Sequence, residues 1–216
     1  MKSFLIIGLN SFGMSVATTL YHLGNEVLAV DEDPAKVQSI ADQVTEALTS
    51  DCRDEAVLQS LGAADFDCVI VALTNDQQAS TLIAMMLKDL GAKSILCQAA
   101  DRLHERLLKR VGADKVVCAE SDLGAKVAQS LSSTNILDFI ELSDQYSIAE
   151  LNIPKPWIGK TLRELEMRTR YGLNVVARKD ALSDMIDITV SPDYAFTATD
   201  VLVIIGSNQD ISRLPS

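Results

Sequence analysis

Two glycines and one acidic residue near the start of the chain have the types and spacing that suit a bound nucleotide. The stretch IIGLNSFG places Gly8 at the end of an apolar run and Gly13 at the start of a helical pattern. Backbone N–H groups in the first turn of such a helix face its N-terminus, where the helix dipole favours phosphate. Asp31 ends a second apolar run and suits the hydroxyl groups of a ribose, while its charge disfavours a 2′-phosphate. The arrangement predicts a nucleotide site.

Position 10 departs from the glycine pattern that usually forms this turn. Asn10 stands where a second glycine normally lets the backbone approach a pyrophosphate. Asparagine is among the residues that best tolerate a positive φ angle, so the turn is still expected to form. Its side chain adds bulk on the phosphate side. A working site, an altered site and a silent site are therefore all open at this point.

Residues after the third and fourth apolar runs extend the expected site. Asp51 and Cys52 follow the third run, where the edge of an adenine ring could be contacted. Ala72, Leu73 and Thr74 follow the fourth run and are expected to line the nucleotide site. The carboxyl ends of parallel strands meet at one edge of a sheet, so all five would lie close to the glycine turn.

The first 134 residues alternate short apolar runs with helical patterns, which predicts a Rossmann-like, doubly wound parallel sheet of the α/β class. The runs are apolar throughout rather than alternating with polar residues, as in strands covered on both faces. The expected strands are 4–9, 26–31, 46–50, 68–73, 94–99 and 115–119, and the expected helices are 13–23, 34–42, 54–61, 76–90, 102–111 and 121–131.

Residues 135–216 show a different pattern and predict a small α+β C-terminal lobe. Residues 121–150 would connect the two lobes, and an amphipathic helix with Val127, Leu131 and Ile136 could serve dimerisation. Within the lobe we expect a short apolar helix and a strand in 135–154, a helix at 160–172, and strands at 174–179, 187–192 and 200–206.

Charge narrows the classes of partner. The formal net charge of −11 argues against a nucleic-acid partner. Between Lys155 and Lys179, however, seven basic residues accompany two acidic ones. A solvated helix face is the ordinary interpretation of such a segment, and an anion site is the alternative.

Catalysis has little support in the sequence. The four cysteines have no metal or redox spacing, and the two histidines have no companion. An NAD-dependent oxidoreductase is a competing interpretation, but residues 135–216 contain neither histidine nor cysteine for such chemistry.

The sequence also bears on location. No apolar run approaches the roughly 20 residues of a membrane span, and the chain enters a strand pattern at once, without a leader pattern. We therefore expect a cytoplasmic protein that reaches a membrane only through a partner.

The assembled motifs resemble the Ktr/Trk family of potassium-transport regulatory subunits, which carry RCK (or KTN) domains. The resemblance covers essentially the whole chain, and its later segments are more specific than the glycine turn. The segments that carry it are IIGLNSFG (6–13), NEVLAVDEDPAKV (25–37), VIVAL (69–73), QASTLIAMMLKDLGA (78–92), RVGADKVVCAESDLGAKVAQSL (110–131) and LSDQYSIAEL (142–151).

The resemblance implies a non-enzymatic gating ring on a membrane potassium channel or transporter subunit. Homodimers would assemble into an octamer, with no nucleic-acid partner and no insertion into the membrane. ATP and ADP in the first lobe would favour different ring shapes, which requires that each ligand bind the two shapes with different affinity. Cyclic di-AMP would bind the C-terminal lobe.

The resemblance also assigns nucleotide-binding residues position by position. Asp31 would hold the ribose, and Lys36 would approach the nucleotide from the next helix. The full implied set is Gly8, Leu9, Asn10, Ser11, Phe12, Gly13, Asp31, Glu32, Lys36, Asp51, Cys52, Ala72, Leu73 and Thr74.

Two further sites follow from the same resemblance. Glu120 would face a divalent or monovalent cation between subunits, although a single carboxylate is an incomplete metal site without further oxygen ligands. Arg168 and Asn174 match the cyclic di-AMP pocket, and Pro192 matches its lining. An arginine pair related by dimer symmetry would suit phosphate.

Two positions depart from the family pattern GLGRFG: Asn10 replaces a glycine, and Ser11 replaces an arginine that would face the terminal phosphate. Loss of that cation removes charge-assisted hydrogen bonds worth roughly 1.5–3 kcal/mol each. Discrimination between ATP and ADP is thus the property in question. Binding of AMP or NAD(H) is one alternative, and a ring with a silent first site that acts through its C-terminal lobe or assembly is another.

Overall fold

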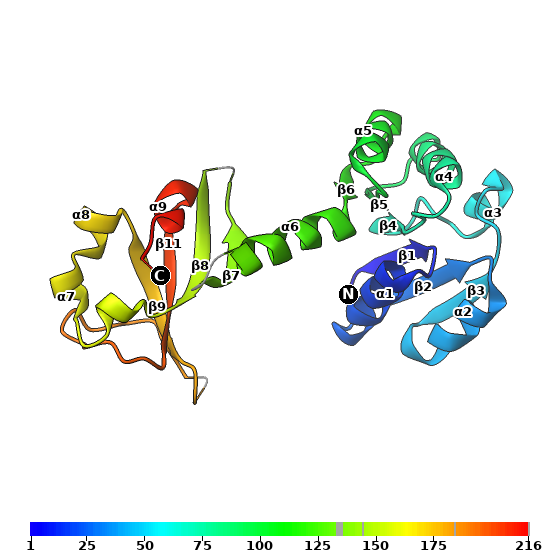
Figure 1. The fold of residues 1–216 in the computed structure, drawn as a ribbon. Coiled ribbons are helices and arrows are strands. Elements are labelled where there is room, and N and C mark those ends of the chain that lie inside the picture. The colour runs from blue at the N-terminus through cyan, green and yellow to red at the C-terminus, as the bar shows by residue number, and fades with distance from the viewer. Residues whose placement is uncertain (133–135, 144, 184, 216) are drawn as a thin grey trace. The chain divides into compact units, whose positions relative to one another are not determined.

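The computed structural model describes residues 1–132, 136–143, 145–183 and 185–215 (Figure 1). Contacts divide the chain into two compact units, Met1–Asp122 and Leu123–Ser216. The expected domain boundary, between residues 134 and 135, lies outside the described residues and stays a prediction. The two units are described separately below.

The N-terminal unit is built on a parallel sheet with the strand order β3-β2-β1-β4-β5-β6. The sheet is doubly wound, as the apolar runs predicted, and the strand order places its switch point between β1 and β4. The strands are β1 (Ser3–Ile7), β2 (Glu26–Asp31), β3 (Glu46–Thr49), β4 (Cys68–Val71), β5 (Ile95–Gln98) and β6 (Lys115–Val117).

Helices connect these strands and cover both faces of the sheet. Each of α1, α2, α3, α4 and α5 joins two successive strands (Figure 1), and α6 follows β6. A short 3₁₀ helix, η1 (Ala41–Gln43), follows α2. The helices are α1 (Ser11–His22), α2 (Pro34–Ile40), α3 (Glu55–Ser60), α4 (Gln77–Asp89), α5 (Arg102–Val111) and α6 (Ala119–Ser132).

Alternate residues of the central strands belong to different cores. Leu5 and Ile7 of β1 pack in one cluster with residues of α3, α4 and α5, whereas Ile6 packs in another with residues of α1 and α2. All three strand residues are buried because both faces of the sheet are covered. This two-sided burial explains why the strands read as continuous apolar runs.

The C-terminal unit is an antiparallel sheet with the order β10-β9-β11-β8-β7 and short helices. Trp157 and Phe196 are among its largest fully buried side chains. Its elements are β7 (Ile136–Glu141), β8 (Tyr146–Asn152), η2 (Lys155–Trp157), α7 (Leu162–Leu165), α8 (Met167–Tyr171), β9 (Asn174–Asp180), β10 (Ile186–Asp187), β11 (Asp200–Ser207) and α9 (Asn208–Ser212).

Three predictions within this unit were wrong. The expected apolar helix after residue 135 is instead β7, which pairs with β8, so Ile136 lies in a strand and not on an amphipathic helix. The expected helix 160–172 is broken at Glu166, whose φ angle is 50°. This break allows Leu165 and Met167, two residues apart, both to be buried. The expected strand 187–192 shrinks to β10 at the sheet edge.

An ion pair with a fully buried carboxylate joins β9 to the start of β11 in the antiparallel sheet. The Arg178 guanidinium donates to Asp200 Oδ1 at 2.8 Å, and the Asp200 side chain is fully buried. The other oxygen of Asp200 accepts from the N–H of Thr197 at 2.7 Å. The Tyr194 ring lies against the guanidinium, whose carbon is 4.4 Å from the ring centroid. The loop before β11 is thereby tied to β9.

Candidate functional site

A cleft of about 200 Å³ opens at the carboxyl ends of β1, β2, β3 and β4, beside the switch point of the N-terminal sheet. Ligands of doubly wound folds bind at this place. Ten of the fourteen residues expected at a nucleotide line it: Gly8, Asn10, Asp31, Glu32, Lys36, Asp51, Cys52, Ala72, Leu73 and Thr74. The other lining residues are Ile7, Val30, Ser50, Arg53, Asn75, Asp76, Ala79 and Ile83.

The remaining four expected residues do not line the cleft. Leu9 is buried and contributes its backbone N–H to the turn. Ser11 is the exposed first residue of α1. Phe12, the second residue of α1, is half-buried and packs against the core cluster that contains Ile6. Gly13 is buried in the first turn of α1. A role for any of the fourteen in binding stays a prediction.

Both glycines of the turn are required by the packing of the protein itself. Gly8 has a φ angle of 95°, and a Cβ atom there would lie 2.5 Å from the backbone oxygen of Ala72. A Cβ on Gly13 would collide with the backbone oxygen of Gly8. The glycine spacing therefore brings β1, β4 and α1 close together, whether or not a ligand is present.

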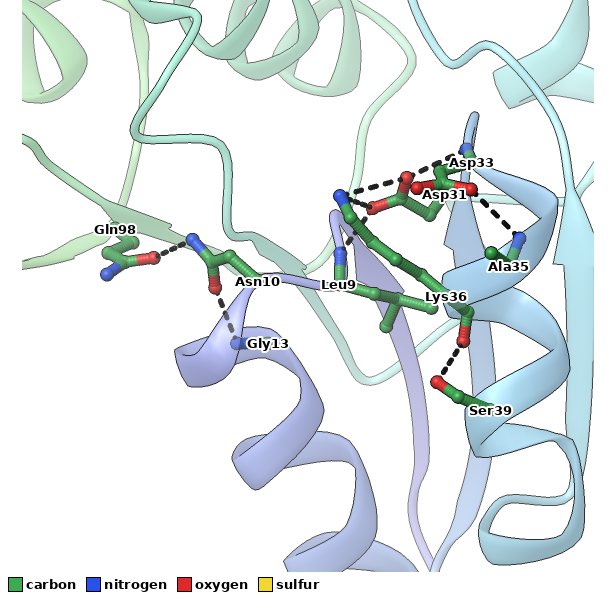
Figure 2. Close-up of polar contacts among 9 residues, drawn as sticks. All are labelled: Leu9, Asn10, Gly13, Asp31, Asp33, Ala35, Lys36, Ser39 and Gln98. Carbon is green, nitrogen blue, oxygen red and sulfur yellow. Dashed lines mark hydrogen bonds and ion pairs between the residues drawn. The ribbon is translucent and has the colours of Figure 1, made fainter.

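Asn10 has a different role from the one its sequence position suggested. Its φ and ψ angles are −76° and 179°, so the turn forms, as expected, but without the positive φ angle that asparagine tolerates. Asn10 is the N-cap of α1, and its side-chain oxygen accepts from the N–H of Gly13 at 2.9 Å (Figure 2). The side-chain amide of Asn10 donates to Gln98 Oε1 at 2.8 Å.

Asp31 ties the end of β2 to the turn after β1. Its Oδ2 accepts from the N–H of Leu9 at 2.6 Å, and its Oδ1 accepts from the N–H of Asp33 at 2.9 Å (Figure 2). Lys36 Nζ lies 3.2 Å from Oδ2. Burial, the largest influence, opposes ionisation, but these hydrogen bonds outweigh it and hold the pKa of Asp31 below its usual range.

Arg53 also lines the cleft, and the sequence analysis missed it. Its guanidinium donates to both oxygens of Asp51 at 2.8 Å and to Glu32 Oε2 at 2.8 Å. These bonds link the loop after β3 to the loop after β2. The signal that could have revealed Arg53 is a basic residue directly after the expected Asp51–Cys52 pair.

Cys52 is suited to packing rather than to chemistry. The side chain is buried, and burial, with smaller contributions from the charges of Asp51 and Asp31, raises the pKa of the thiol to about 12. A neutral thiol at this position gives the cleft a small apolar wall.

Asp76 is a second residue that the sequence analysis missed. It lines the cleft and caps α4, because its side chain accepts from the N–H of Ala79 at 2.9 Å.

Gln98 connects the glycine turn to the start of α6. It ends β5, is almost fully buried, and donates from Nε2 to Glu120 Oε1 at 3.3 Å. A polar residue at the last position of an apolar strand was the signal for this contact.

Among the described residues, no group of three or more His, Cys, Asp or Glu side chains is placed to hold a metal ion. Cation binding by Glu120, which is exposed, stays a prediction.

The three residues assigned to a cyclic dinucleotide are all exposed in the C-terminal unit. Arg168 lies in α8, Asn174 begins β9, and the backbone oxygen of Pro192 accepts from the N–H of Arg163 at 3.0 Å. Within the basic segment, Arg163 and Arg178 are paired with carboxylates. Binding at this surface stays a prediction.

The strand order and the cleft at its switch point define the N-terminal unit as a domain of the dinucleotide-binding fold class. Two domain families match the chain: the TrkA-N domain over residues 4–119 and the TrkA-C domain over residues 147–214. The chain therefore belongs to the Ktr/Trk family of potassium uptake proteins, and in it the TrkA-N domain is followed by the TrkA-C domain.

Two relatives from one organism match over nearly their whole length. Ktr system potassium uptake proteins A and C of Bacillus subtilis (strain 168) are each 39% identical to this chain, and each match covers 98% of this chain and 95% of the relative. Within the described ranges, no helix has both the length and the apolar content that crossing a membrane requires.

Solved structures share the fold. The RCK domain of GsuK superposes with a TM-score of 0.70 at 21% identity, over 98% of this chain and 46% of that one. The GsuK channel bound to NAD gives a TM-score of 0.69 at 20% identity, over 97% of this chain and 38% of that one. This chain thus spans less than half of the GsuK chains that it matches.

Proposed function

We propose that this chain is a non-enzymatic regulatory subunit of a potassium uptake system, controlled by an adenine nucleotide in its N-terminal cleft. The observation that carries the proposal is the 39% identity to Ktr system potassium uptake protein A, which extends over 98% of this chain and 95% of the relative. The cleft supplies the ligand site, because its turn, its acidic residue and its apolar wall suit an adenosine group.

Control by a nucleotide needs two conformations that bind it with different affinity. The cleft is bordered by the loops after β2 and β3, which Arg53 links through Glu32 and Asp51. A nucleotide that contacts these loops changes their hydrogen bonds and so favours one conformation. ATP and ADP are candidate ligands, and AMP or NAD(H) are alternatives. The GsuK channel, part of which shares the fold of this chain, has been solved bound to NAD.

Self-association has a surface that supports it. Leu123, Val127 and Leu131 follow one another at intervals of four residues on α6, and their side chains are 63%, 49% and 82% exposed. This spacing forms one apolar stripe, which a second copy of the chain would cover. We propose a homodimer that assembles into an octameric ring, located in the cytoplasm and held at the membrane by its channel or transporter subunit.

The C-terminal unit is proposed as a second ligand site. Arg168 and Asn174 lie on the exposed surface at α8 and the start of β9, and Arg168 suits the phosphates of cyclic di-AMP. Glu120 is proposed as a ligand of a cation at a subunit interface, completed by oxygen atoms from a nucleotide or a second copy.

Growth at limiting potassium tests the regulatory function. A bacterium that lacks its own potassium uptake systems is given a Ktr-type membrane subunit, with or without this chain. We expect growth at low potassium only when both are present. Equal growth without this chain contradicts the proposal. The Asp31→Asn variant tests the nucleotide part, with Asp89→Asn as the matched control, because Asp89 is exposed on α4 away from the lining residues.

A further inference from the structure

We propose that Asn10 is a specificity-determining residue: its carboxamide occupies the phosphate-facing end of α1, so that the affinity of the cleft for adenine nucleotides does not rise with the number of phosphates. The inference rests on the proposed nucleotide site and names the class of ligand that it accepts. Adenosine 5′-monophosphate is expected to bind as tightly as ATP.

The first step of the argument concerns the N-terminus of α1. The first turn of a helix has backbone N–H groups without partners in the helix, and these are the groups that bind phosphate in nucleotide folds. Here the Asn10 side chain already accepts from the N–H of Gly13 at 2.9 Å. Asn10 lines the cleft and Gly13 does not. A phosphate must therefore displace the Asn10 carboxamide to reach that donor.

The second step concerns how firmly the carboxamide is held. Asn10 Nδ2 donates to Gln98 Oε1 at 2.8 Å, and Gln98 is only 1% exposed (Figure 2). Gln98 Nε2 in turn donates to Glu120 Oε1 at 3.3 Å. Turning the Asn10 side chain aside would break its bonds to both Gly13 and Gln98. The buried side-chain oxygen of Gln98 would then lose the donor that Asn10 provides.

The third step concerns charge. Among the described lining residues, four carboxylates (Asp31, Glu32, Asp51 and Asp76) accompany two cations. Lys36 is paired with Asp31, and Arg53 is paired with Asp51 and Glu32. The first residue of α1, Ser11, is uncharged. Each added phosphate therefore brings negative charge into a cleft whose cations already have carboxylate partners.

The groups at the other side of the cleft suit the part of the ligand that all adenine nucleotides share. The Asp31 carboxylate lies at the end of β2, where ribose hydroxyls are bound in this fold. Ala72, Leu73 and Ile83 supply apolar lining for a base or sugar. Affinity is thus expected to come from the adenosine end.

Titration calorimetry with adenosine, AMP, ADP and ATP tests the inference on three chains. For the wild type we expect dissociation constants of AMP, ADP and ATP within about threefold of one another. Asn10→Gly frees the Gly13 N–H and is expected to tighten ADP and ATP at least about tenfold relative to AMP. Glycine costs little as an N-cap, so this variant is expected to fold, which a thermal melt checks. Asn10→Ser retains a capping oxygen and is the matched control, with affinities as even as those of the wild type.

The outcomes separate the inference from the proposed function. If the wild type binds ATP tenfold more tightly than AMP, or if Asn10→Gly leaves the affinities even, the inference is wrong while the nucleotide site stands. If none of the ligands binds to any of the three chains, the nucleotide site itself is refuted, and the inference with it. Even affinities in the wild type together with tighter ADP and ATP in Asn10→Gly support both.

Discussion

The carboxylate of Asp31 accepts a hydrogen bond from the backbone N–H of Leu9 at 2.6 Å. Asp31 ends β2 and Leu9 lies in the turn after β1, so the end of β2 is joined directly to the glycine turn. Lys36 adds a cation to the same carboxylate. Asp31 therefore holds the glycine turn in shape, in addition to the ribose contact that we propose for it.

Replacing Asp31 tests this double role. Asp31→Asn keeps the size of the side chain but loses its charge and places an amide group among the donors of Leu9, Asp33 and Lys36. We expect the free energy of unfolding to fall by about 1–3 kcal/mol. The affinity for AMP is expected to fall about tenfold or more, as for the loss of a charged hydrogen-bond partner. Urea unfolding and calorimetry measure the two effects.

The exposed Asp89→Asn variant serves as the control and is expected to change neither quantity. Unchanged stability in Asp31→Asn would show that the bond to Leu9 contributes nothing to the turn. Unchanged affinity would remove Asp31 from the ligand site.

Asp31 also predicts a pH dependence of stability. Its pKa in the folded chain lies below the ordinary value of 3.8, so the folded state holds this proton less tightly than the unfolded state. The stabilisation from the ionised carboxylate is complete above the unfolded pKa and is lost as the pH falls through the folded pKa. The stability difference between wild type and Asp31→Asn is therefore expected to be constant from about pH 7 to pH 5 and to shrink below about pH 4.

Urea unfolding of the two chains across this range measures the difference. A gap that widens on acidification would contradict the assignment of a lowered pKa to Asp31. An NMR titration of the carboxyl carbon gives the folded pKa independently.

The C-terminal unit offers a test of its own stability. Asp200→Ala leaves the partly buried guanidinium of Arg178 without its carboxylate and removes the acceptor of the Thr197 N–H. Breaking such a pair is expected to cost about 3 kcal/mol. Asp193→Ala is the matched control, because it removes a partner of Arg163 at an exposed pair and is expected to change stability little. Equal effects of the two substitutions on urea unfolding would contradict the role of the Arg178–Asp200 pair.

The N-terminal fold could be predicted from the sequence because its strands are covered on both faces. Runs such as those around Ile6 and Ile70 are apolar throughout, and that pattern has few other structural solutions. In the C-terminal unit, Ile136 and Phe139 are three residues apart and resemble a helix face. Pairing with β8, including an irregularity between Ile136 and Asp138, makes the segment a strand instead. A pairing of this kind depends on a partner elsewhere in the chain.

The sequence predicted those residues of the candidate site whose place depends on where a strand ends. It did not predict the contacts that depend on the direction of a side chain. Gly8 and Asp31 line the cleft at the positions that strand and turn require. The contact between Asn10 and Gln98 joins residues 88 positions apart, and only the strand order brings them together. The capping role of Asn10 depends on which way its carboxamide points, which residue type alone does not determine.

Potassium flux into vesicles tests the central claim most directly. The vesicles contain a Ktr-type membrane subunit, with this chain or its Asp31→Asn variant added, and the flux is measured with and without AMP. We predict that AMP changes the flux about fivefold or more when the wild-type chain is bound, and that Asp31→Asn binds the membrane subunit but loses the response. A flux that is the same with and without this chain, or a response to AMP that survives in Asp31→Asn, would contradict the account.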